Sequence, residues 1–292
     1  MHFGLRLPSN GPHADAEHII RIGQLAESLG FESLWCNDHI IMPANTAFTP
    51  TYGRLFEALI TLAALSTVTR RVKLGTGILI LPLRDPILVA KQAATLDAYS
   101  KGRLILGVGV GWEPDEYRFL NVDFAQRGRR CDEWIGVIRK VWRGTDITIH
   151  TETVQIMDGV SEPRPFEPDG PAILVGGDSM AALRRAAQLG DGWIPASYMS
   201  METIAEGVKK IKGLAPVSHK GLVYVFRRPS GSFAKADVVD QMLGTVSALQ
   251  NLGVKHCVLV LPEEYSPAVM AEEISLFVEK VMGRAESLAF PP

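Results

Sequence analysis

An aspartate and a histidine stand side by side in residues 35–39, where a short apolar run gives way to polar residues. Histidine is the side chain most easily tuned to give or take a proton near neutral pH, and a neighbouring hydrogen-bond partner decides which ring nitrogen is available. Asp38 and His39 are therefore candidates for a proton-transfer site at the end of a strand. Because adjacent residues of a strand face opposite ways, the alternative is a solvated polar pair that begins a loop.

A second candidate site lies in residues 173–183, where a short apolar run, two glycines and a polar pair precede a helical pattern. Gly176 and Gly177 lack a Cβ, so an anion can approach the backbone, and the helix start supplies free N–H groups. The stretch matches neither the dinucleotide fingerprint nor the Walker loop. It indicates either a phosphate site or a tight turn with Asp178 or Ser179 as the helix N-cap.

Glycines also end two other apolar segments, residues 75–78 and 107–111. Alternate glycines clear side chains from one face of a strand, so that backbone can lie close to a flat ligand. Trp112 and Glu113 follow the second segment and supply a stacking surface and a proton donor or acceptor. Glycine bulges without a ligand are the alternative. Together with a phosphate site, the glycine-lined strand ends favour a planar cofactor with a phosphorylated tail.

Short apolar segments alternate with helical patterns along the chain, and these elements must position the candidate residues. We expect strands at residues 2–7, 33–36, 72–78, 103–108, 172–175, 192–194, 221–226 and 255–261. We expect helices at residues 15–29, 55–69, 86–99, 131–142, 179–189, 201–214, 236–250 and 267–282. Strict alternation through eight strands, without a linker, predicts a single α/β domain over residues 1–292 that folds as a (β/α)8 TIM barrel. An open doubly wound sheet is the alternative, since strand closure is not visible in sequence.

Three expected helices end in leucine followed by glycine, at Gly30, Gly190 and Gly253. Glycine just past a helix adopts the left-handed conformation that closes the last turn, so the chain can return directly to the sheet. This punctuation is typical of βα units.

Three long segments interrupt the alternation and predict insertions into the barrel. They follow strand two (37–54) and strand four (109–130), and they precede strand five (145–171). Within the last, residues 146–150 and 153–157 predict a small hairpin. Loops that follow strands lie on the catalytic face of a βα barrel, so their length favours a built-up pocket over surface decoration.

Composition is that of a globular enzyme. The 292 residues are 47% hydrophobic with a formal net charge of -2, which favours neither disorder nor nucleic-acid binding. The first residues lack a signal-peptide pattern and no apolar run has the length of a membrane helix, so we expect no membrane partner and a cytoplasmic location. Three cysteines lack metal-site spacing, so buried thiols are expected in place of a disulfide or zinc site. They are Cys36, Cys131 and Cys257.

The sequence resembles the luciferase-like monooxygenase superfamily, and most closely its coenzyme F420-dependent oxidoreductases. The resemblance covers nearly the whole chain, and it rests on several moderately specific motifs in the same order. They are residues 34–39, 74–78, 102–112, 127–133 and 175–193.

The resemblance implies roles for individual residues. The family position of His39 lies beside the deazaflavin ring and transfers protons or holds the ring, and that of Asp38 contacts the polar edge of the ring. The peptide that matches Gly77–Ile78 is often cis and bulges against the ring. The expected catalytic residues are His39 and Glu113. The expected cofactor-binding residues are Asp38, His39, Thr76, Gly77, Ile78, Gly109, Gly176, Gly177, Asp178 and Ser179, and no metal site is expected.

The function implied is hydride transfer between F420 and a small organic substrate, with His39 as the proton-transfer residue. An FMN-dependent monooxygenase and a non-catalytic flavin-binding protein are the alternatives, because FMN also carries a phosphate. The Asp38-His39 pair favours F420, since the FMN branch more often has Glu-His there. Sugar-phosphate dehydrogenases of the family carry glutamate where this chain has Trp112, which counts against sugar-phosphate oxidation.

Two further expectations concern the pocket and the assembly. Arg227 and Arg228 are isolated candidates for a second phosphate. Dimers are common among relatives, so a homodimer is expected, with residues 55–65 and 86–96 as interface helices or as ordinary barrel-packing faces. Trp112 and Glu113 are expected to shape the pocket, and further candidates for its apolar walls are Phe48, Tyr52, Met199 and Phe226.

Overall fold

The computed structural model describes residues 1–216 and 219–285. Within them, eight parallel strands pair side by side, and the last pairs with the first, so the sheet is closed. The predicted (β/α)8 barrel is confirmed, and the open sheet is excluded. The barrel strands in their order around the ring are β1 (His2–Arg6), β2 (Ser33–Cys36), β3 (Lys73–Thr76), β5 (Leu104–Gly109), β8 (Ala172–Gly176), β9 (Gly192–Ile194), β10 (Leu222–Arg227) and β11 (His256–Leu259).

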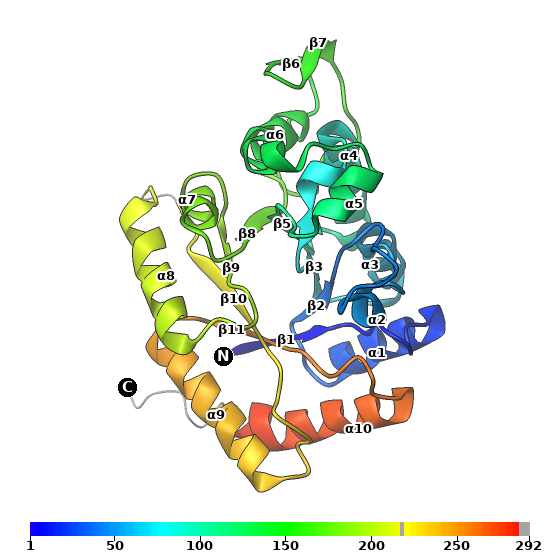
Figure 1. Ribbon diagram of the computed structural model, residues 1–292, viewed down its shortest axis with the longest axis vertical. Helices are drawn as coiled ribbons and strands as arrows, with labels where there is room; N and C mark the ends of the chain where they lie inside the picture. The colour runs from blue at the N-terminus through cyan, green and yellow to red at the C-terminus, as the bar shows by residue number, and fades with distance from the viewer. Residues whose placement is uncertain (217–218, 286–292) are drawn as a thin grey trace.

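Helices surround the barrel, as Figure 1 shows. Those that connect successive barrel strands or follow the last one are α1 (Ala16–Ser28), α3 (Ala58–Val68), α4 (Pro86–Ser100), α6 (Arg127–Val141), α7 (Met180–Gln188), α8 (Met201–Leu214), α9 (Ala236–Asn251) and α10 (Pro267–Phe277). Shorter elements are α2 (Thr49–Tyr52), β4 (Leu79–Ile80), a 3-10 turn (Leu81–Leu83), α5 (Pro114–Phe119), a second 3-10 turn (Phe124–Gln126), a π-helix (Val278–Met282) and α11 (Gly283–Ala285).

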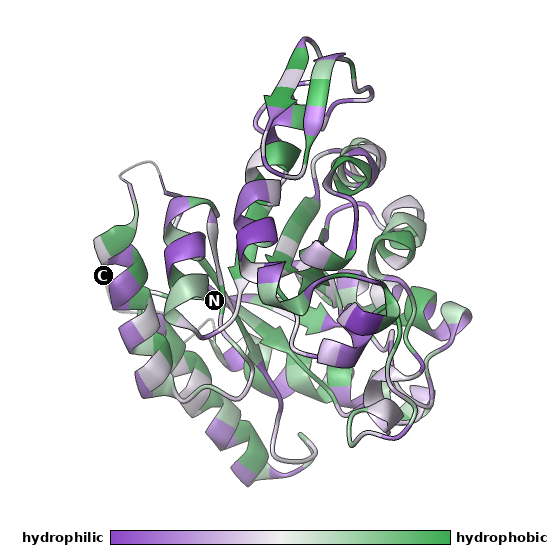
Figure 2. Ribbon diagram, turned by 45° about the horizontal axis from the view of Figure 1, so that its top comes forward, coloured by the Kyte–Doolittle hydropathy of each residue, from purple (hydrophilic) through white to green (hydrophobic). Residues whose placement is uncertain are grey.

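Hydrophobic residues form two layers, one inside the barrel and one between the strands and the helices. Alternate strand residues point to opposite faces, so Leu34 packs in the outer layer and Trp35 in the inner one. Trp35 is fully buried, and its indole Nε1–H donates to the Ser33 hydroxyl at 2.8 Å. The hydrophobic strands at the centre and the mixed hydropathy of the helices are visible in Figure 2. This packing leaves the strand ends as the places where side chains can meet a ligand.

Polar residues begin several helices. The Asp85 carboxylate accepts the N–H groups of Ile87 and Leu88, both at 2.9 Å, at the start of α4. Ser200 and Ser266 cap α8 and α10 in the same manner. The predicted helix from residue 131 begins earlier, at Arg127, because a polar first turn carries no apolar periodicity.

Two of the three predicted glycine caps are confirmed. Gly30 and Gly253 have φ of +91° and +75°, the left-handed conformation that only glycine adopts readily. The prediction for Gly190 is wrong, because its φ is not positive. A Cβ at Gly190 would lie 3.1 Å from the Ala186 carbonyl oxygen and 3.1 Å from Val175 Cγ2, so this glycine permits close packing of α7 on β8.

The three predicted insertions are present. The segment after β2 contains α2, the segment after β5 contains α5, and the segment before β8 contains an antiparallel hairpin. The hairpin strands are β6 (Ile147–His150) and β7 (Gln155–Gly159), and they project away from the barrel at the top of Figure 1. The first two insertions contribute to the site.

The cysteines are buried free thiols, as predicted: Cys36, Cys131 and Cys257. Across residues 1–216 and 219–285, no helix combines the length and the apolar character that a membrane crossing requires.

Candidate functional site

A cavity of about 350 Å³ lies at the carboxyl ends of the barrel strands, a size within the range of cofactor pockets. It brings together the predicted Gly77–Ile78 peptide and the predicted glycine turn at residues 176–179. The residues that line it are Arg6, Asn37, Tyr52, Gly77, Ile78, Val110, Gly111, Trp112, Gly176, Gly177, Asp178, Ser179, Ala182, Ile194, Pro195, Ala196, Ser197, Tyr198, Phe226 and Val260.

A smaller recess of about 110 Å³ adjoins this cavity and contains His39. The two spaces share Tyr52, Ile78 and Trp112 as walls. The His39 ring packs against Tyr52 with ring centroids 4.8 Å apart, and against the edge of Trp112 at 5.3 Å. His39 therefore lies beside the cavity within an aromatic surround.

Glu116 on α5 holds the His39 ring. Its Oε2 lies 2.7 Å from His39 Nδ1, and both side chains are almost completely buried. Its Oε1 accepts the N–H groups of Ile40 and Ile41 at 2.5 and 3.3 Å, which ties the loop after His39 to α5. When Glu116 Oε2 accepts this hydrogen bond, the ring proton of His39 is on Nδ1, and Nε2 is the nitrogen that can take up a proton.

Sequence reasoning missed Glu116 and selected Glu113 instead. Glu113 is the N-cap of α5, and its carboxylate accepts the Asp115 N–H at 3.1 Å. It is not among the lining residues of either cavity, and its catalytic role stays a prediction. The proline of Glu113-Pro114-x-Glu116 indicates the helix start, but Glu116 contacts residues 39–41 of a distant loop, which this pattern does not predict.

Asp38 is buried beneath the recess and is paired. Its two oxygens accept hydrogen bonds from the Arg84 guanidinium at 2.8 and 2.7 Å, and Oδ2 also accepts the Ile80 N–H at 2.8 Å. Burial raises the pKa of Asp38, while Arg84 and the Ile80 N–H act in the opposite direction. The side chain has no exposed surface. Because Ile80 and Arg84 both follow β3, these hydrogen bonds anchor the segment after β3 to Asp38.

The segment after β3 enters the cavity at Ile78. The Gly77–Ile78 peptide is cis, in agreement with the resemblance. The predicted strand 72–78 is shorter in the structure, where β3 ends at Thr76. A methyl group on Gly176 would lie 2.6 Å from Ile78 Cγ2, and one on Gly109 would overlap with Ile78 Cδ1. The glycines of β5 and β8 therefore make room for Ile78, whose side chain then forms a wall of the cavity.

Thr76 and Gly109 lie behind that wall. The Thr76 hydroxyl is buried and donates to the Gly107 carbonyl at 2.7 Å, so it ties β3 to β5. Neither residue lines the cavities. Their predicted contact with a cofactor stays a prediction, and the structure shows them supporting Ile78.

The glycine turn begins α7 with a capped end and free donors. The Ser179 hydroxyl accepts the Ala182 N–H at 3.2 Å, and Gly177 has φ of +123°. Within the described part of the chain, the N–H groups of residues 178–181 have no hydrogen-bond acceptor. These donors and the positive end of the helix dipole fit a phosphate. The Asp178 carboxylate stands beside them and accepts the Tyr198 hydroxyl, a bond that raises the pKa of Tyr198.

The other predicted pocket residues divide into two groups. Tyr52, Trp112 and Phe226 line the main cavity, and Phe48 packs against Trp112 with centroids 4.6 Å apart. The other three candidates do not line either cavity. Arg227 donates to backbone carbonyls of Ser197 and Met199, Arg228 pairs with Glu263 and Glu264, and Met199 is buried outside both cavities.

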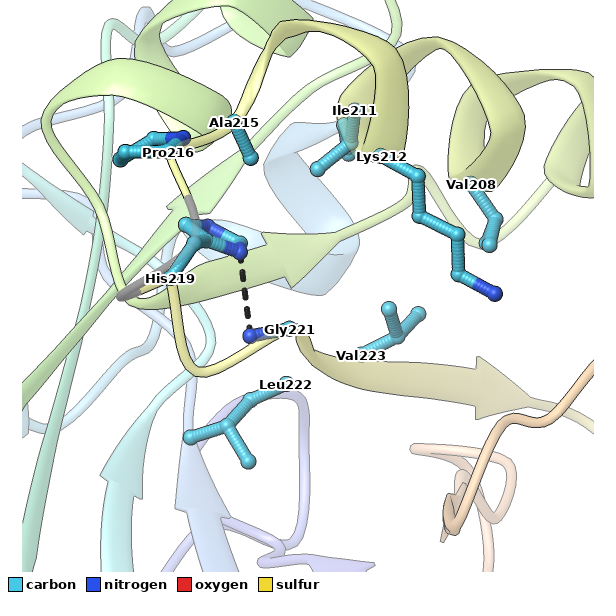
Figure 3. A pocket seen from close by; sticks show the side chains of 9 residues that line it. All are labelled: Val208, Ile211, Lys212, Ala215, Pro216, His219, Gly221, Leu222 and Val223. Atoms are coloured by element: carbon cyan, nitrogen blue, oxygen red, sulfur yellow. Dashed lines mark hydrogen bonds between the residues drawn. The ribbon is translucent and has the colours of Figure 1, made fainter.

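A separate apolar pocket of about 390 Å³ lies between the end of α8 and the start of β10. Figure 3 shows it, with the Gly221 N–H donating to His219 Nδ1 at 3.0 Å. It is at the amino end of β10, whereas the main cavity is lined by Phe226 near the carboxyl end. Among the described residues, no group of three or more His, Cys, Asp or Glu side chains is arranged to hold a metal ion.

Comparison with known families agrees with this geometry. The family described as luciferase-like monooxygenase matches residues 1–229 of the sequence. The chain belongs to the luciferase-like monooxygenase family. The sequence-based resemblance is confirmed, and members of this family are mostly oxidoreductases.

The similar proteins include an F420-dependent enzyme and a monooxygenase. An uncharacterised protein of Mycobacterium tuberculosis is 38% identical over 191 residues, which are 62% of this chain and 65% of the relative, so the match spans just under two thirds of that protein. F420-dependent glucose-6-phosphate dehydrogenase of Amycolatopsis mediterranei is 31% identical over 196 residues, 66% of this chain and 56% of that enzyme. The structure of EDTA monooxygenase from Chelativorans sp. BNC1 has a TM-score of 0.79 and covers 100% of this chain and 95% of its own, and at 14% identity it supports the fold alone.

Proposed function

We propose that this luciferase-like protein transfers a hydride between coenzyme F420 and a small organic substrate, and that His39 exchanges the accompanying proton. The observation that carries the proposal is the placement of His39. Its Nδ1 is occupied by Glu116, and the ring stands in a recess that opens into a cavity with a phosphate-type helix start. A proton site and a flat-cofactor site thus share one space.

The residues of the cavity fit such a cofactor. The free N–H groups of residues 178–181 and the Ser179 hydroxyl would hold its phosphate, and Ile78 would support the face of its ring. When bound, the deazaflavin supplies the hydride acceptor or donor. Among the described lining residues, the Asp178 carboxylate opposes an anion there, and its bond with Tyr198 partly satisfies it.

The protein's own residues would orient the reaction. Glu116 holds the tautomer in which Nε2 of His39 can accept a proton or, once protonated, return it. Asp38 and Arg84 would act indirectly, by fixing the segment that carries Ile78. Tyr52 and Trp112 would keep water from the reacting atoms, which strengthens electrostatic interactions there.

An FMN-dependent monooxygenase is the second candidate function. The family description, luciferase-like monooxygenase, supports it, and the helix start of α7 would accept the phosphate of FMN equally well. The Asp38-His39 pair favours F420 through the family resemblance. Oxygen consumption by the protein with reduced FMN would favour the monooxygenase, and tight cofactor binding without turnover would favour a non-catalytic carrier.

The proposal also retains the expected homodimer. Helices α3 and α4 pack together and leave large apolar side chains in solvent, with Ile60, Leu88 and Tyr99 exposed by 70%, 55% and 67%. We propose that a second copy covers this face. Sedimentation equilibrium of the intact protein tests it, and Ile60→Glu is expected to convert dimer to monomer.

The catalytic proposal is tested at His39. We expect His39→Ala to bind F420 within about threefold of the unchanged protein and to lose at least about tenfold in hydride transfer, equal to about 1.4 kcal/mol in the barrier. Stopped-flow absorbance of the F420 chromophore measures the step, and a fluorescence titration measures binding. His13→Ala is the matched control, since His13 is exposed and outside both cavities. Unchanged hydride transfer in His39→Ala would remove His39 from the reaction.

A further inference from the structure

We propose that the substrate of this site is an uncharged compound, with a flat apolar group and one carbonyl or hydroxyl oxygen that meets His39. This inference rests on the proposed hydride transfer and adds the class of substrate to it. Three features of the recess carry it: its aromatic wall, the pairing of its charges and the position of His39.

The aromatic wall consists of Phe48, Tyr52 and Trp112. Trp112 lies 4.6 Å from Phe48 and 6.4 Å from Tyr52 between ring centroids, with tilted planes. Phe48 and Trp112 keep 49% and 44% of their surface exposed. Large aromatic side chains are stabilised when a ligand covers them, and their faces and edges favour other flat groups. The wall is continuous with the recess of His39, so an occupant of the recess also contacts the wall.

Among the described lining residues, the fixed charges are Arg6, Asp38 and Asp178, and the first two are paired with an opposite charge. Asp38 is held by Arg84, and Glu116 accepts three hydrogen bonds. Asp178 lines the main cavity outside the recess, and its carboxylate would repel an anionic substrate that enters there. A charged substrate in the recess would lose its water without gaining an opposite charge, which is costly in a buried site.

Arg6 is the single lysine or arginine among the lining residues of the two cavities, and it is committed to Glu263. The two side chains are 12% and 13% exposed and form a close ion pair, and Arg228 adds a second contact to Glu263 at 3.1 Å. Burial favours the neutral acid, but Arg6, a backbone N–H and Arg228 together outweigh it and lower the pKa of Glu263. The carboxylate therefore stays charged and neutralises Arg6.

The chemistry balances with one oxygen at His39. In the reducing direction, the carbonyl carbon takes the hydride from the reduced cofactor, the C=O bond becomes a single bond, and the oxygen takes the proton from protonated Nε2. In the oxidising direction, the hydroxyl proton passes to neutral Nε2 as the hydride leaves the carbinol carbon for the oxidised cofactor. No charged group on the substrate takes part in either direction.

Calorimetric titration of the F420-loaded protein tests the proposal with three probes: acetophenone, benzoate and acetone. We expect acetophenone to bind at least tenfold more tightly than either other probe. Trp112→Ala should lower the ratio of acetophenone to acetone affinity at least fivefold, whereas Phe166→Ala, at an exposed aromatic outside both cavities, should leave it unchanged. If Trp112→Ala does not fold, Trp112→Leu removes the same ring.

Glu263→Gln provides the complementary test, because it removes the charge that neutralises Arg6. We expect benzoate to bind at least fivefold more tightly to this variant than to the unchanged protein. Benzoate binding as tight as acetophenone binding in the unchanged protein would overturn the inference, as would an unchanged ratio in both Trp112 variants. Either result with F420 bound leaves the proposed function standing, whereas failure to bind F420 at all contradicts the proposed function itself.

Discussion

Gly109→Ala tests whether the glycines of the barrel mouth exist to admit Ile78. A methyl group at residue 109 would overlap with Ile78 Cδ1, far inside the ordinary carbon contact of about 3.5–4.0 Å. Overpacking of this kind costs about 1–3 kcal/mol, and the loss of glycine from a strand returns about 0.5–1 kcal/mol. We therefore expect Gly109→Ala to lower the free energy of unfolding by about 1–2 kcal/mol and to weaken cofactor binding, because Ile78 must move.

Ile78→Val supplies the rescue, since it removes Cδ1 and leaves Cγ1 as the nearest atom, 3.2 Å from the new methyl group. Ile78→Val alone should cost about 0.5 kcal/mol, the low end for this change, because Ile78 is only half-buried. In a double-mutant cycle measured by urea denaturation, we expect the double variant to be about 1 kcal/mol more stable than the sum of the single changes predicts.

Gly244→Ala is the matched control for that cycle. Gly244 is in the middle of α9 and a methyl group there meets no atom within 4 Å, so this change should stabilise the protein by about 0.5–1 kcal/mol. A Gly109→Ala variant as stable as the unchanged protein, or a cycle with no coupling to Ile78, would refute the packing argument.

Three further predictions concern His39, the phosphate site and pH. Glu116→Gln should slow hydride transfer about tenfold or more by stopped-flow absorbance, because one amide oxygen cannot serve both His39 and the Ile40 N–H; equal rates would contradict this role. Asp178→Asn should tighten binding of the phosphate-bearing cofactor about threefold or more in a fluorescence titration, since it removes an anion beside the phosphate donors; weaker binding would place the phosphate elsewhere. Burial, together with the nearby His2, lowers the pKa of His256 to about 4, so the folded state keeps this ring neutral while the unfolded state takes up a proton below about pH 6.5. Stability should therefore fall by about 2 kcal/mol between pH 6.5 and 4 in urea titrations, and His256→Gln should lose less; an equal loss in both proteins would exclude His256 as the cause.

The strands and most helices could be predicted because their signals are local. Each of β2 and β9 is a short apolar run bounded by polar or glycine residues, and the structure has both at the predicted limits. The position of Asp38 and His39 followed from the same signal, because they come directly after β2. The segment 77–78 could be located, but the resemblance rather than any local pattern indicated its cis peptide.

The pairing of side chains across the barrel could not be predicted. Glu116 reaches His39 across 77 residues of sequence, and Arg84 reaches Asp38 across 46. Such contacts depend on which helix starts and loops the closed sheet brings together, and no periodicity within either segment encodes them. The early start of α6 at Arg127 was missed for a different reason, since its first turn is polar and is held by contacts such as the cation–π pair of Arg127 with Phe124.

The central claim is that this barrel mouth binds a deazaflavin for hydride transfer. Separate fluorescence titrations of the purified protein with oxidised F420 and with FMN test it most directly. We expect a dissociation constant for F420 in the micromolar range and at least about hundredfold weaker binding of FMN, a difference of about 2.7 kcal/mol. Tight FMN binding with no measurable F420 binding would contradict it.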